Sequence, residues 1–356
     1  MDAIGIERGG GEPRLLDVPN PEPGPGEALV RTLRVGVDGT DHEIIAGNHG
    51  RPPDGEGYLV VGHEAVGVVE EPNGTRFERG DVVSPTVRRP PADGTNRYFE
   101  RGEPEMAPPD ATLERGIIGA HGFMSEYFTS PGEYLVPVPS NLARHGFLLE
   151  PMSIAEKALE MATAARSSFD WEPSSALVLG NGSLGLLTVA MLVEDVDVYC
   201  LGRRDRPDPT IDIIEGLGAT YVDSRETPVP EVPAAHEPMD LVYEATGYAP
   251  HAFEAVEALA PNGVAALLGV PGPSTFEIDG GRLHEEMVLE NKALVGSVNS
   301  GARHFEAAID RLRRLPGWFI DEYVTRIAPY REFEPAFRQG TTTIKTAVEF
   351  GRYEER

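Results

Sequence analysis

The chain has 356 residues and a formal net charge of −27, from 58 Asp and Glu against 31 Lys and Arg. This length exceeds what one hydrophobic core usually organises, so we expect two domains. The charge makes nucleic acid and anionic membranes poor partners, because both are negatively charged themselves. No apolar run approaches the roughly 18 residues that span a bilayer, and the start, MDAIGIERGG, does not have the basic and apolar pattern of a secretory signal. We therefore expect a cytoplasmic protein.

The acidic residues are spread among apolar stretches rather than gathered in one tail. This distribution favours an acidified folded surface over a disordered acidic segment. In dilute salt so much like charge repels itself, whereas at molar salt the Debye length shrinks to about 3 Å and screens the repulsion. The composition favours a halophilic source over a merely acidic mesophilic protein.

The single cysteine, Cys200, excludes an intrachain disulfide and a structural zinc site built from four cysteines. Any metal site must therefore use His, Asp and Glu side chains.

The first part of the chain, residues 1–152, is rich in Gly and Pro and contains short β-like runs such as EALVRTLRVGV at 27–37 and HEAVGVV at 63–69. This texture predicts an irregular, mainly antiparallel β domain with long loops. The segment 84–116 has many turn formers and little apolar periodicity, which predicts a lobe or a lid.

From about residue 153 to 296 the pattern alternates between strand-like and helix-like segments. A helical stretch at 152–165 precedes a strand, turn and helix at 175–193, and the short apolar strands DVYCLG, DLVYEATG and GVAALLGV follow. Such βαβ patterning predicts a doubly wound parallel sheet. The last part, residues 297–356, offers an amphipathic helix, HFEAAIDRLRRL, and a strand-like KTAVEF that can return to the first domain.

A glycine-rich turn lies between the predicted strand ALVL and the predicted helix LLTVAML. Its residues are Gly180, Asn181, Gly182, Ser183, Leu184 and Gly185. In a G-x-G-x-x-G turn the first glycine allows the tight turn, the second lets the backbone approach a pyrophosphate, and the third allows close helix packing. The motif in this context predicts a dinucleotide-binding site.

The next strand ends in Gly202-Arg203-Arg204 rather than in an acidic residue. Two guanidinium groups there can bind a 2′-phosphate, so we predict NADP as the preferred cofactor. NAD is the alternative, with Asp205 binding the ribose and the arginines merely solvated. Further residues are expected to border the cofactor at the carboxyl ends of later strands: Thr246, Gly247, Leu268, Gly269, Val270, Val298 and Asn299.

Three short segments of the first domain carry metal-binding residue types: Asp38-Gly39-Thr40-Asp41-His42, Gly62-His63-Glu64-Ala65-Val66-Gly67 and Leu149-Glu150-Pro151. Together with the dinucleotide motif they resemble the zinc-dependent medium-chain alcohol dehydrogenase family along essentially the whole chain. The resemblance implies a GroES-like catalytic domain over 1–152, a Rossmann domain over 153–296, and a return of 297–356 to the catalytic domain.

The same resemblance implies that Asp38, His63 and Glu150 bind zinc, with Glu64 able to coordinate the metal or to bind its water. Asp38 stands where the family usually has Cys. A carboxylate keeps the negative charge but weakens the preference for a soft metal, so Mg or Mn becomes an alternative. This departure, the missing cysteine cluster and the acidity are similar to the glucose dehydrogenases of extremely halophilic archaea.

That branch implies oxidation of D-glucose and related aldoses to the aldonolactone, as in a modified Entner–Doudoroff pathway, by a homodimer or a tetramer. Thr40 is expected to bond the reacting oxygen. Glu114, Glu150 and Asn299 are expected to contact the sugar, whereas we interpret His42 as a loop histidine rather than part of a proton relay. The alternatives are a zinc alcohol or polyol dehydrogenase, and a metal-free NADPH-binding protein resembling quinone reductases.

Overall fold

The computed structural model describes residues 1–91 and 94–354, and the chain divides into two compact units. Unit 1 consists of Met1–Ser153, Asn299–Arg314 and Val324–Arg356, and unit 2 of Ile154–Val298 and Leu315–Tyr323. The segment 297–356, expected to return as a whole to the first domain, is therefore divided. Its part in unit 2 packs locally, because Tyr323 Oη lies 2.6 Å from Ser183 Oγ and the Trp318 ring covers Gly216.

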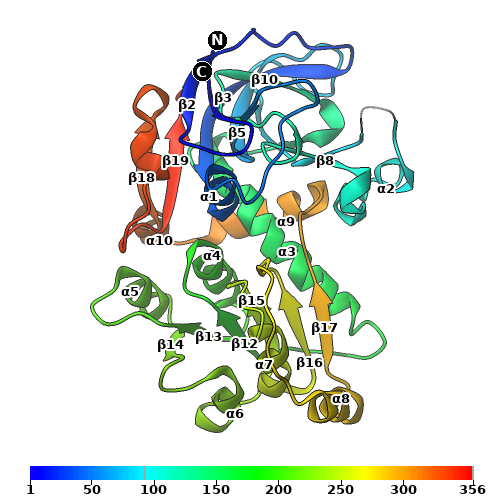
Figure 1. Ribbon diagram of the computed structural model, residues 1–356, viewed down its shortest axis with the longest axis vertical. Helices are drawn as coiled ribbons and strands as arrows, with labels where there is room; N and C mark the ends of the chain where they lie inside the picture. Colours follow the sequence, from blue (N-terminus) through cyan, green and yellow to red (C-terminus); the bar gives the residue numbers. More distant parts are fainter. Residues whose placement is uncertain (92–93, 355–356) are drawn as a thin grey trace. The chain divides into compact units, whose positions relative to one another are not determined.

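Unit 1 is built on a seven-stranded, mostly antiparallel sheet in the order β11-β6-β5-β3-β19-β18, with β10 also pairing with β3 (Figure 1). The strands are β3 (Glu27–Val37), β5 (Glu64–Glu71), β6 (Val82–Pro85), β10 (Tyr127–Pro131), β11 (Leu135–Pro137), β18 (Val324–Pro329) and β19 (Lys345–Glu349). The predicted strands at 27–37 and 63–69 are both present. The predicted return of KTAVEF is confirmed as well, since β19 pairs antiparallel with β3.

Smaller elements complete unit 1. One three-stranded sheet contains β1 (Asp2–Glu7), β2 (Arg14–Asp17) and β4 (Tyr58–Val60), and another contains β7 (Arg88–Arg89), β8 (Leu113–Arg115) and β9 (Gly119–Ala120). The helices are α1 (Gly39–Ile45), α2 (Arg97–Glu100), α9 (Ala302–Arg314), η1 (Pro104–Met106), η2 (Pro109–Ala111), η3 (Gly132–Tyr134), η4 (Ser140–Leu142), η5 (Gly146–Leu148), η7 (Tyr330–Glu332) and η8 (Glu334–Phe337). The predicted lobe at 84–116 thus holds α2, η1 and η2, and its residues 92–93 lie outside the described residues.

Unit 2 is a six-stranded parallel sheet in the order β14-β13-β12-β15-β16-β17 (Figure 1). Its strands are β12 (Ser175–Leu179), β13 (Asp197–Gly202), β14 (Thr220–Asp223), β15 (Met239–Glu244), β16 (Leu259–Leu267) and β17 (Ala293–Gly296). The helices are α4 (Ser183–Leu192), α5 (Pro209–Gly216), η6 (Val229–Glu231), α6 (Val232–Ala235), α7 (His251–Ala258), α8 (Gly280–Leu289) and α10 (Gly317–Tyr323), and α3 (Leu149–Ala164) precedes them. Strands alternate with helices and the order reverses about β12, as in a doubly wound sheet.

Each unit has its own hydrophobic core. The core of unit 1 includes Val35, Phe123 and Phe128, and the core of unit 2 includes Leu177, Val242 and Ala265. The α/β fold class, with a mainly-β GroES-like domain and a doubly wound Rossmann domain, is therefore confirmed.

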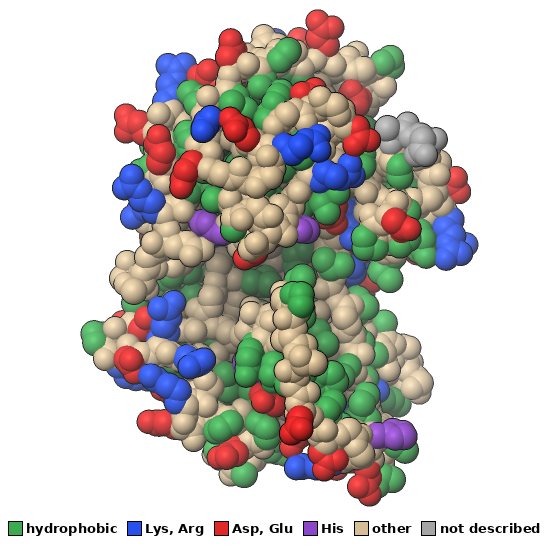
Figure 2. Space-filling model, viewed as in Figure 1, with side chains coloured by type: hydrophobic (Ala, Val, Ile, Leu, Met, Phe, Trp, Pro, Cys, Tyr) green, Lys and Arg blue, Asp and Glu red, His purple; other side chains and the backbone are tan. Residues whose placement is uncertain are grey.

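Acidic side chains are scattered over the face shown in Figure 2, interspersed with basic ones, and form no single acidic block there. Within the described residues, no helix is both long enough and apolar enough to cross a membrane.

Candidate functional site

Asp38 lies between the end of β3 and the start of α1, where it caps the helix. Its Oδ1 accepts a hydrogen bond from the Asp41 amide at 3.1 Å, and Asp41 Oδ2 accepts one from the Asp38 amide at 3.1 Å. This reciprocal capping box satisfies backbone donors at the helix start and fixes both side chains. Thr40 Oγ1 donates to Asp38 Oδ2 at 3.1 Å, which places the Thr40 hydroxyl beside the same carboxylate.

His63 reaches Asp38 because of the strand pairing. In the antiparallel pair of β3 and β5, Gly36 lies opposite Glu64, so the end of β3 adjoins the start of β5. His63 is buried, and its Nε2 lies 3.5 Å from Asp38 Oδ2. A register shift by one residue would turn these side chains to opposite faces of the sheet.

Glu64 and Lys345 form a buried ion pair beside this cluster. Because β19 pairs with β3, Lys345 lies next to the end of β3, and its Nζ also donates to the Val37 carbonyl at 3.2 Å. A Cβ at position 36 would collide with the Glu64 carboxylate, so Gly36 leaves the space that this side chain occupies.

Glu150 joins the cluster from the start of α3. Two sets of side chains can each offer ligand atoms that all lie within 4.8 Å of one another: Asp38, Asp41 and His63, and His63, Glu64 and Glu150. The structure therefore brings together the four residues that the sequence predicted to bind metal and adds Asp41, which the sequence analysis did not assign.

The electrostatics of the cluster suit a cation. Burial and the surrounding carboxylates raise the pKa of Glu150 to about 8 and that of Asp41 to about 7. Burial alone would raise the pKa of Asp38 as well, but the charge of His63 lowers it below its ordinary value. Burial would lower the pKa of His63, but the charge of Asp38 and the hydrogen bond to it raise that pKa well above its ordinary value.

The donor set therefore fits a divalent metal ion. Four carboxylates, those of Asp38, Asp41, Glu64 and Glu150, are offset by one imidazole and one ammonium group. In addition, the buried Asp41 Oδ1 has no hydrogen-bond partner among the described residues. Imidazole and carboxylates are accepted ligands of zinc, while a carboxylate-rich set also suits Mg and Mn.

Glu114 and Asn299, expected to contact the sugar, are also brought together in unit 1. Asn299 Nδ2 donates to Glu114 Oε1 at 2.9 Å, although the two residues are 185 positions apart. Arg88 Nε donates to the same oxygen at 3.0 Å. The sequence analysis missed Arg88, because nothing near it in the chain distinguishes it from the adjacent Arg89 in the predicted lobe.

The glycine-rich turn in unit 2 has the geometry that its motif requires. Gly180 has φ +109°, and a Cβ at Gly185 would collide with the Gly180 carbonyl, so each position needs glycine. A Cβ at Gly182 would meet no atom, which leaves open space before the first residue of α4. Three other predicted residues lie in this turn. Asn181 Nδ2 donates a hydrogen bond to Thr210 Oγ1 at 2.6 Å. Ser183 and Leu184 are the first two residues of α4, and both are half-buried.

Arg203 and Arg204 follow β13 and are exposed. Among the described residues, neither guanidinium group has a hydrogen bond or an ion pair. Asp205, the alternative ribose ligand, is instead paired with Arg225 at 2.7 Å. This arrangement favours the arginines over Asp205 as the groups available to a nucleotide.

The remaining predicted cofactor residues lie at the carboxyl ends of neighbouring parallel strands. Thr246 and Gly247 follow β15, and their amides donate to the buried Glu244 Oε1 at 2.7 and 3.0 Å. Gly269 approaches Gly247 so closely that a Cβ would not fit. The other predicted residues differ in exposure: Leu268 is buried, Val270 and Val298 are exposed, and Asn299 belongs to unit 1. Glu244, which the sequence analysis missed, shapes this turn.

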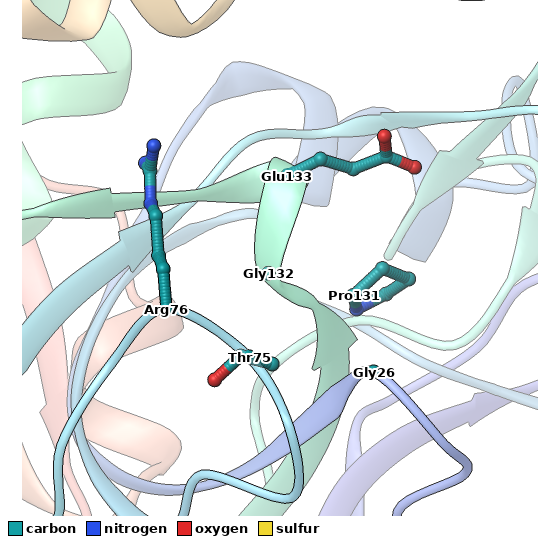
Figure 3. Close-up of a pocket in the computed structure, with 6 residues that line it drawn as sticks. All are labelled: Gly26, Thr75, Arg76, Pro131, Gly132 and Glu133. Atoms are coloured by element: carbon teal, nitrogen blue, oxygen red, sulfur yellow. The ribbon is translucent and has the colours of Figure 1, made fainter.

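One cavity of about 420 Å³ lies in unit 1, away from every predicted site residue. Figure 3 shows its lining, which is formed by Gly26, Thr75, Arg76, Pro131, Gly132 and Glu133. Arg76 extends from the loop between β5 and β6 and Glu133 from η3, and Arg76 already donates to the Leu135 carbonyl at 3.1 Å. None of the chemistry described above involves this cavity.

Comparisons with known proteins give a consistent result. Residues 143–350 match a family model described as "Glucose dehydrogenase C-terminus", and residues 24–140 match one described as "Alcohol dehydrogenase GroES-like domain". Glucose 1-dehydrogenase from Haloferax mediterranei is 64% identical, with 98% of this chain and 99% of the relative covered. The corresponding enzyme from Haloarcula marismortui is 61% identical with the same coverage.

Solved structures agree. The Haloferax mediterranei glucose dehydrogenase in complex with NADP, Zn and gluconolactone has a TM-score of 0.97 at 64% identity and covers 99% of this chain and 100% of its own. 2R,3R-butanediol dehydrogenase from Bacillus subtilis has a TM-score of 0.80 at 21% identity, with 98% of this chain and 99% of its own covered, which supports the fold alone.

Proposed function

The chain belongs to the glucose dehydrogenase branch of the zinc-dependent medium-chain alcohol dehydrogenase family, and we propose that it oxidises D-glucose and related aldoses to the aldonolactone with NADP as oxidant. The observation that carries the proposal is the near-identical fold of a 64%-identical enzyme whose structure contains NADP, Zn and gluconolactone. The buried cluster around His63 and the exposed arginine pair after β13 support it independently.

Asp38, His63 and Glu150 would hold the zinc ion, with Glu64 next to it. The ion supplies a Lewis acid that makes the reacting hydroxyl more acidic. Asp38 is kept in its charged form by His63 and held by the capping box of α1. Lys345 neutralises Glu64, which limits the repulsion among the carboxylates when they are brought together.

We assign to Thr40 the hydrogen bond that accepts the proton of the substrate hydroxyl. Its Oγ1 already donates to Asp38 Oδ2, so the hydroxyl has a fixed direction, and its lone pairs remain able to accept a hydrogen bond. A hydroxyl held in this way can accept a hydrogen bond from the reacting hydroxyl and orient its oxygen.

In unit 2 the turn 180–185 and the start of α4 would bind the pyrophosphate of NADP. The first amide groups of a helix have no partner within the helix and carry the positive end of its dipole, which favours phosphate. Arg203 and Arg204 would bind the 2′-phosphate, while Thr246, Gly247, Leu268, Gly269, Val270 and Val298 would border the ribose and nicotinamide. The nicotinamide ring accepts the hydride from the sugar.

Sugar recognition is assigned to Glu114, Asn299 and Glu150 in unit 1. Carboxylates accept hydrogen bonds from ring hydroxyls, and an amide both donates to and accepts from them. A site built for such hydroxyls discriminates strongly against analogues that do not have them. The pairing of Glu114 with Asn299 supports a common role for the two.

We assign the catalytic role to unit 1 and NADP binding to unit 2, in place of the contiguous ranges 1–152, 153–296 and 297–356.

A homodimer or a tetramer would form through the free edge of the sheet at β17. Support comes from α8 before it, where Val288 and Leu289 are 61% and 71% exposed. The acidic composition and the haloarchaeal relatives support a salt-rich cytoplasm as the working environment.

The first experiment measures NADP reduction in multimolar KCl with glucose, xylose, galactose and simple alcohols, before and after chelation and zinc restoration. Glucose-dependent reduction that chelation abolishes and zinc restores supports the proposal. Activity with simple alcohols or polyols only would move the assignment to an alcohol dehydrogenase. NADPH binding without any alcohol oxidation, unaffected by chelation, would favour a metal-free NADPH-binding protein.

A further inference from the structure

Arg88 is a buried arginine whose guanidinium group joins two segments of unit 1. The residue lies on β7 and is 3% exposed, and its Nε donates to Glu114 Oε1 on β8 at 3.0 Å. Its Nη1 donates to the carbonyl oxygens of Glu105 at 2.9 Å and of Ala107 at 2.7 Å. A planar guanidinium with fixed donor directions determines the position of a carboxylate more narrowly than an ammonium group does.

The Glu114 carboxylate is held through one oxygen only. Oε1 accepts hydrogen bonds from both Arg88 and Asn299. Oε2 has no donor among the described residues, and it is not fully buried. The Glu114 side chain as a whole is 15% exposed. Oε2 is therefore an accessible acceptor whose direction is set by the two bonds to Oε1.

The segment that carries Asn299 contacts Glu105 in η1, the residue whose carbonyl Arg88 also binds. The Glu105 carboxylate is buried and pairs with Arg303 Nη1 at 2.6 Å in the first turn of α9. It also lies against Gly301 so closely that a Cβ there would collide with it. Since Arg88 holds the Glu105 carbonyl, a closed ring of contacts fixes Glu114 relative to Asn299.

We infer that Arg88 is a positioning residue for sugar recognition. It turns Glu114 Oε1 towards the protein and so presents Oε2 to accept hydrogen bonds from one or two hydroxyl groups of the sugar. Arg88 acts through Glu114 and makes no contact with the sugar itself. This inference rests on the proposed function, because it takes Glu114 and Asn299 to be the residues that contact the sugar.

The test is a kinetic comparison of Arg88→Met with the wild-type protein, with zinc supplied and KCl held constant. The loss of a buried, charge-assisted hydrogen bond predicts a rise in the KM for glucose of roughly 10- to 100-fold. We expect kcat to change less, and the KM for NADP and the bound zinc to stay the same. Arg88→Lys keeps the buried charge and one donor, so it should recover part of the loss, and it carries the test if the methionine variant is unstable.

The matched control is Arg89→Met, on the same strand. Arg89 is 7% exposed, and its guanidinium donates to the Thr86 carbonyl and to Ser130 Oγ rather than to Glu114. A general loosening of this region would affect both variants, whereas loss of Glu114 positioning affects only the change at position 88.

A series of deoxy sugars supplies the second measurement. In the wild-type protein, removal of each hydroxyl that Glu114 binds lowers kcat/KM, and in Arg88→Met this penalty should shrink while Arg89→Met retains it. An unchanged KM for glucose in both Arg88 variants would overturn the inference. It would also be overturned if Arg88→Met and Arg89→Met lost kcat/KM equally and showed the same deoxy-sugar penalties. Failure of the proposed function is distinct, since the wild-type protein itself would then not oxidise glucose.

Discussion

Lys345 Nζ pairs with the Glu64 carboxylate in the interior of unit 1, where the side chains are 1% and 2% exposed. Removal of one partner leaves the other charge buried without compensation, which typically costs about 3–5 kcal/mol. We therefore expect Lys345→Met to lower the free energy of unfolding of the chelated protein by about that amount. Denaturant unfolding at constant KCl measures the difference.

Lys292→Met is the matched control for this prediction. Lys292 is also buried, but its partners Glu286 and Glu290 are 19% and 41% exposed, so water can solvate them when the lysine is removed. We expect a loss of roughly 1 kcal/mol or less. Equal losses for the two lysines would contradict a special role of the pair with Glu64.

Gly36 keeps space for the Glu64 carboxylate, which a Cβ at position 36 would meet. Because Lys345 holds that carboxylate in place, Gly36→Ala should overpack the site and cost about 1–3 kcal/mol of stability. We also expect less bound zinc at limiting zinc, measured by elemental analysis. Gly39→Ala is the control, since a Cβ there meets no atom, and it should behave like the wild-type protein.

Arg203 and Arg204 are predicted to determine the choice between NADP and NAD. Replacement of both by Ala should raise the KM for NADP roughly tenfold or more, because two charge-assisted contacts to the 2′-phosphate are lost. The KM for NAD should change little. Arg206→Ala is the control, because Arg206 is already paired with Glu215. Equal effects on NADP and NAD would show that the arginines do not contact the 2′-phosphate.

The pair of Arg34 with Glu349 predicts a pH-dependent contribution to stability. Burial alone would raise the pKa of Glu349, but hydrogen bonds from Arg34 and Arg352 lower it below its ordinary value of 4.5. A carboxyl group whose pKa is lower in the folded state stabilises the fold above its ordinary pKa and loses this contribution as the pH falls through the folded-state pKa.

Glu349→Gln should therefore be less stable than the wild-type protein near neutral pH, and the difference should shrink as the pH falls below about 4.5. Denaturant unfolding of both proteins across this range, at constant KCl, tests the prediction. Glu71→Gln, which changes an exposed glutamate on β5, serves as the control for the loss of one surface charge. A difference that does not vary with pH would mean that Glu349 acts through packing alone.

Several features were predictable because they depend on residues close together in the chain. The turn Gly180–Gly185 lies between a strand and a helix within one short segment, and the alternation of apolar strands and helices at 153–296 predicts a parallel sheet without any long-range information. The strands at 27–37 and 63–69 follow from the same kind of local pattern. The family resemblance then indicated Asp38, His63, Glu150, Glu114 and Asn299 as site residues.

Tertiary structure alone decided which other side chains join these sites. Lys345 enters the cluster through the pairing of β19 with β3, and Glu114 meets Arg88 and Asn299, which lie 26 and 185 positions away in the chain. It also assigned Leu315–Tyr323 to unit 2, where Tyr323 contacts Ser183. The sequence determines local conformation through nearby residues, whereas register and packing determine which distant side chains share one buried space.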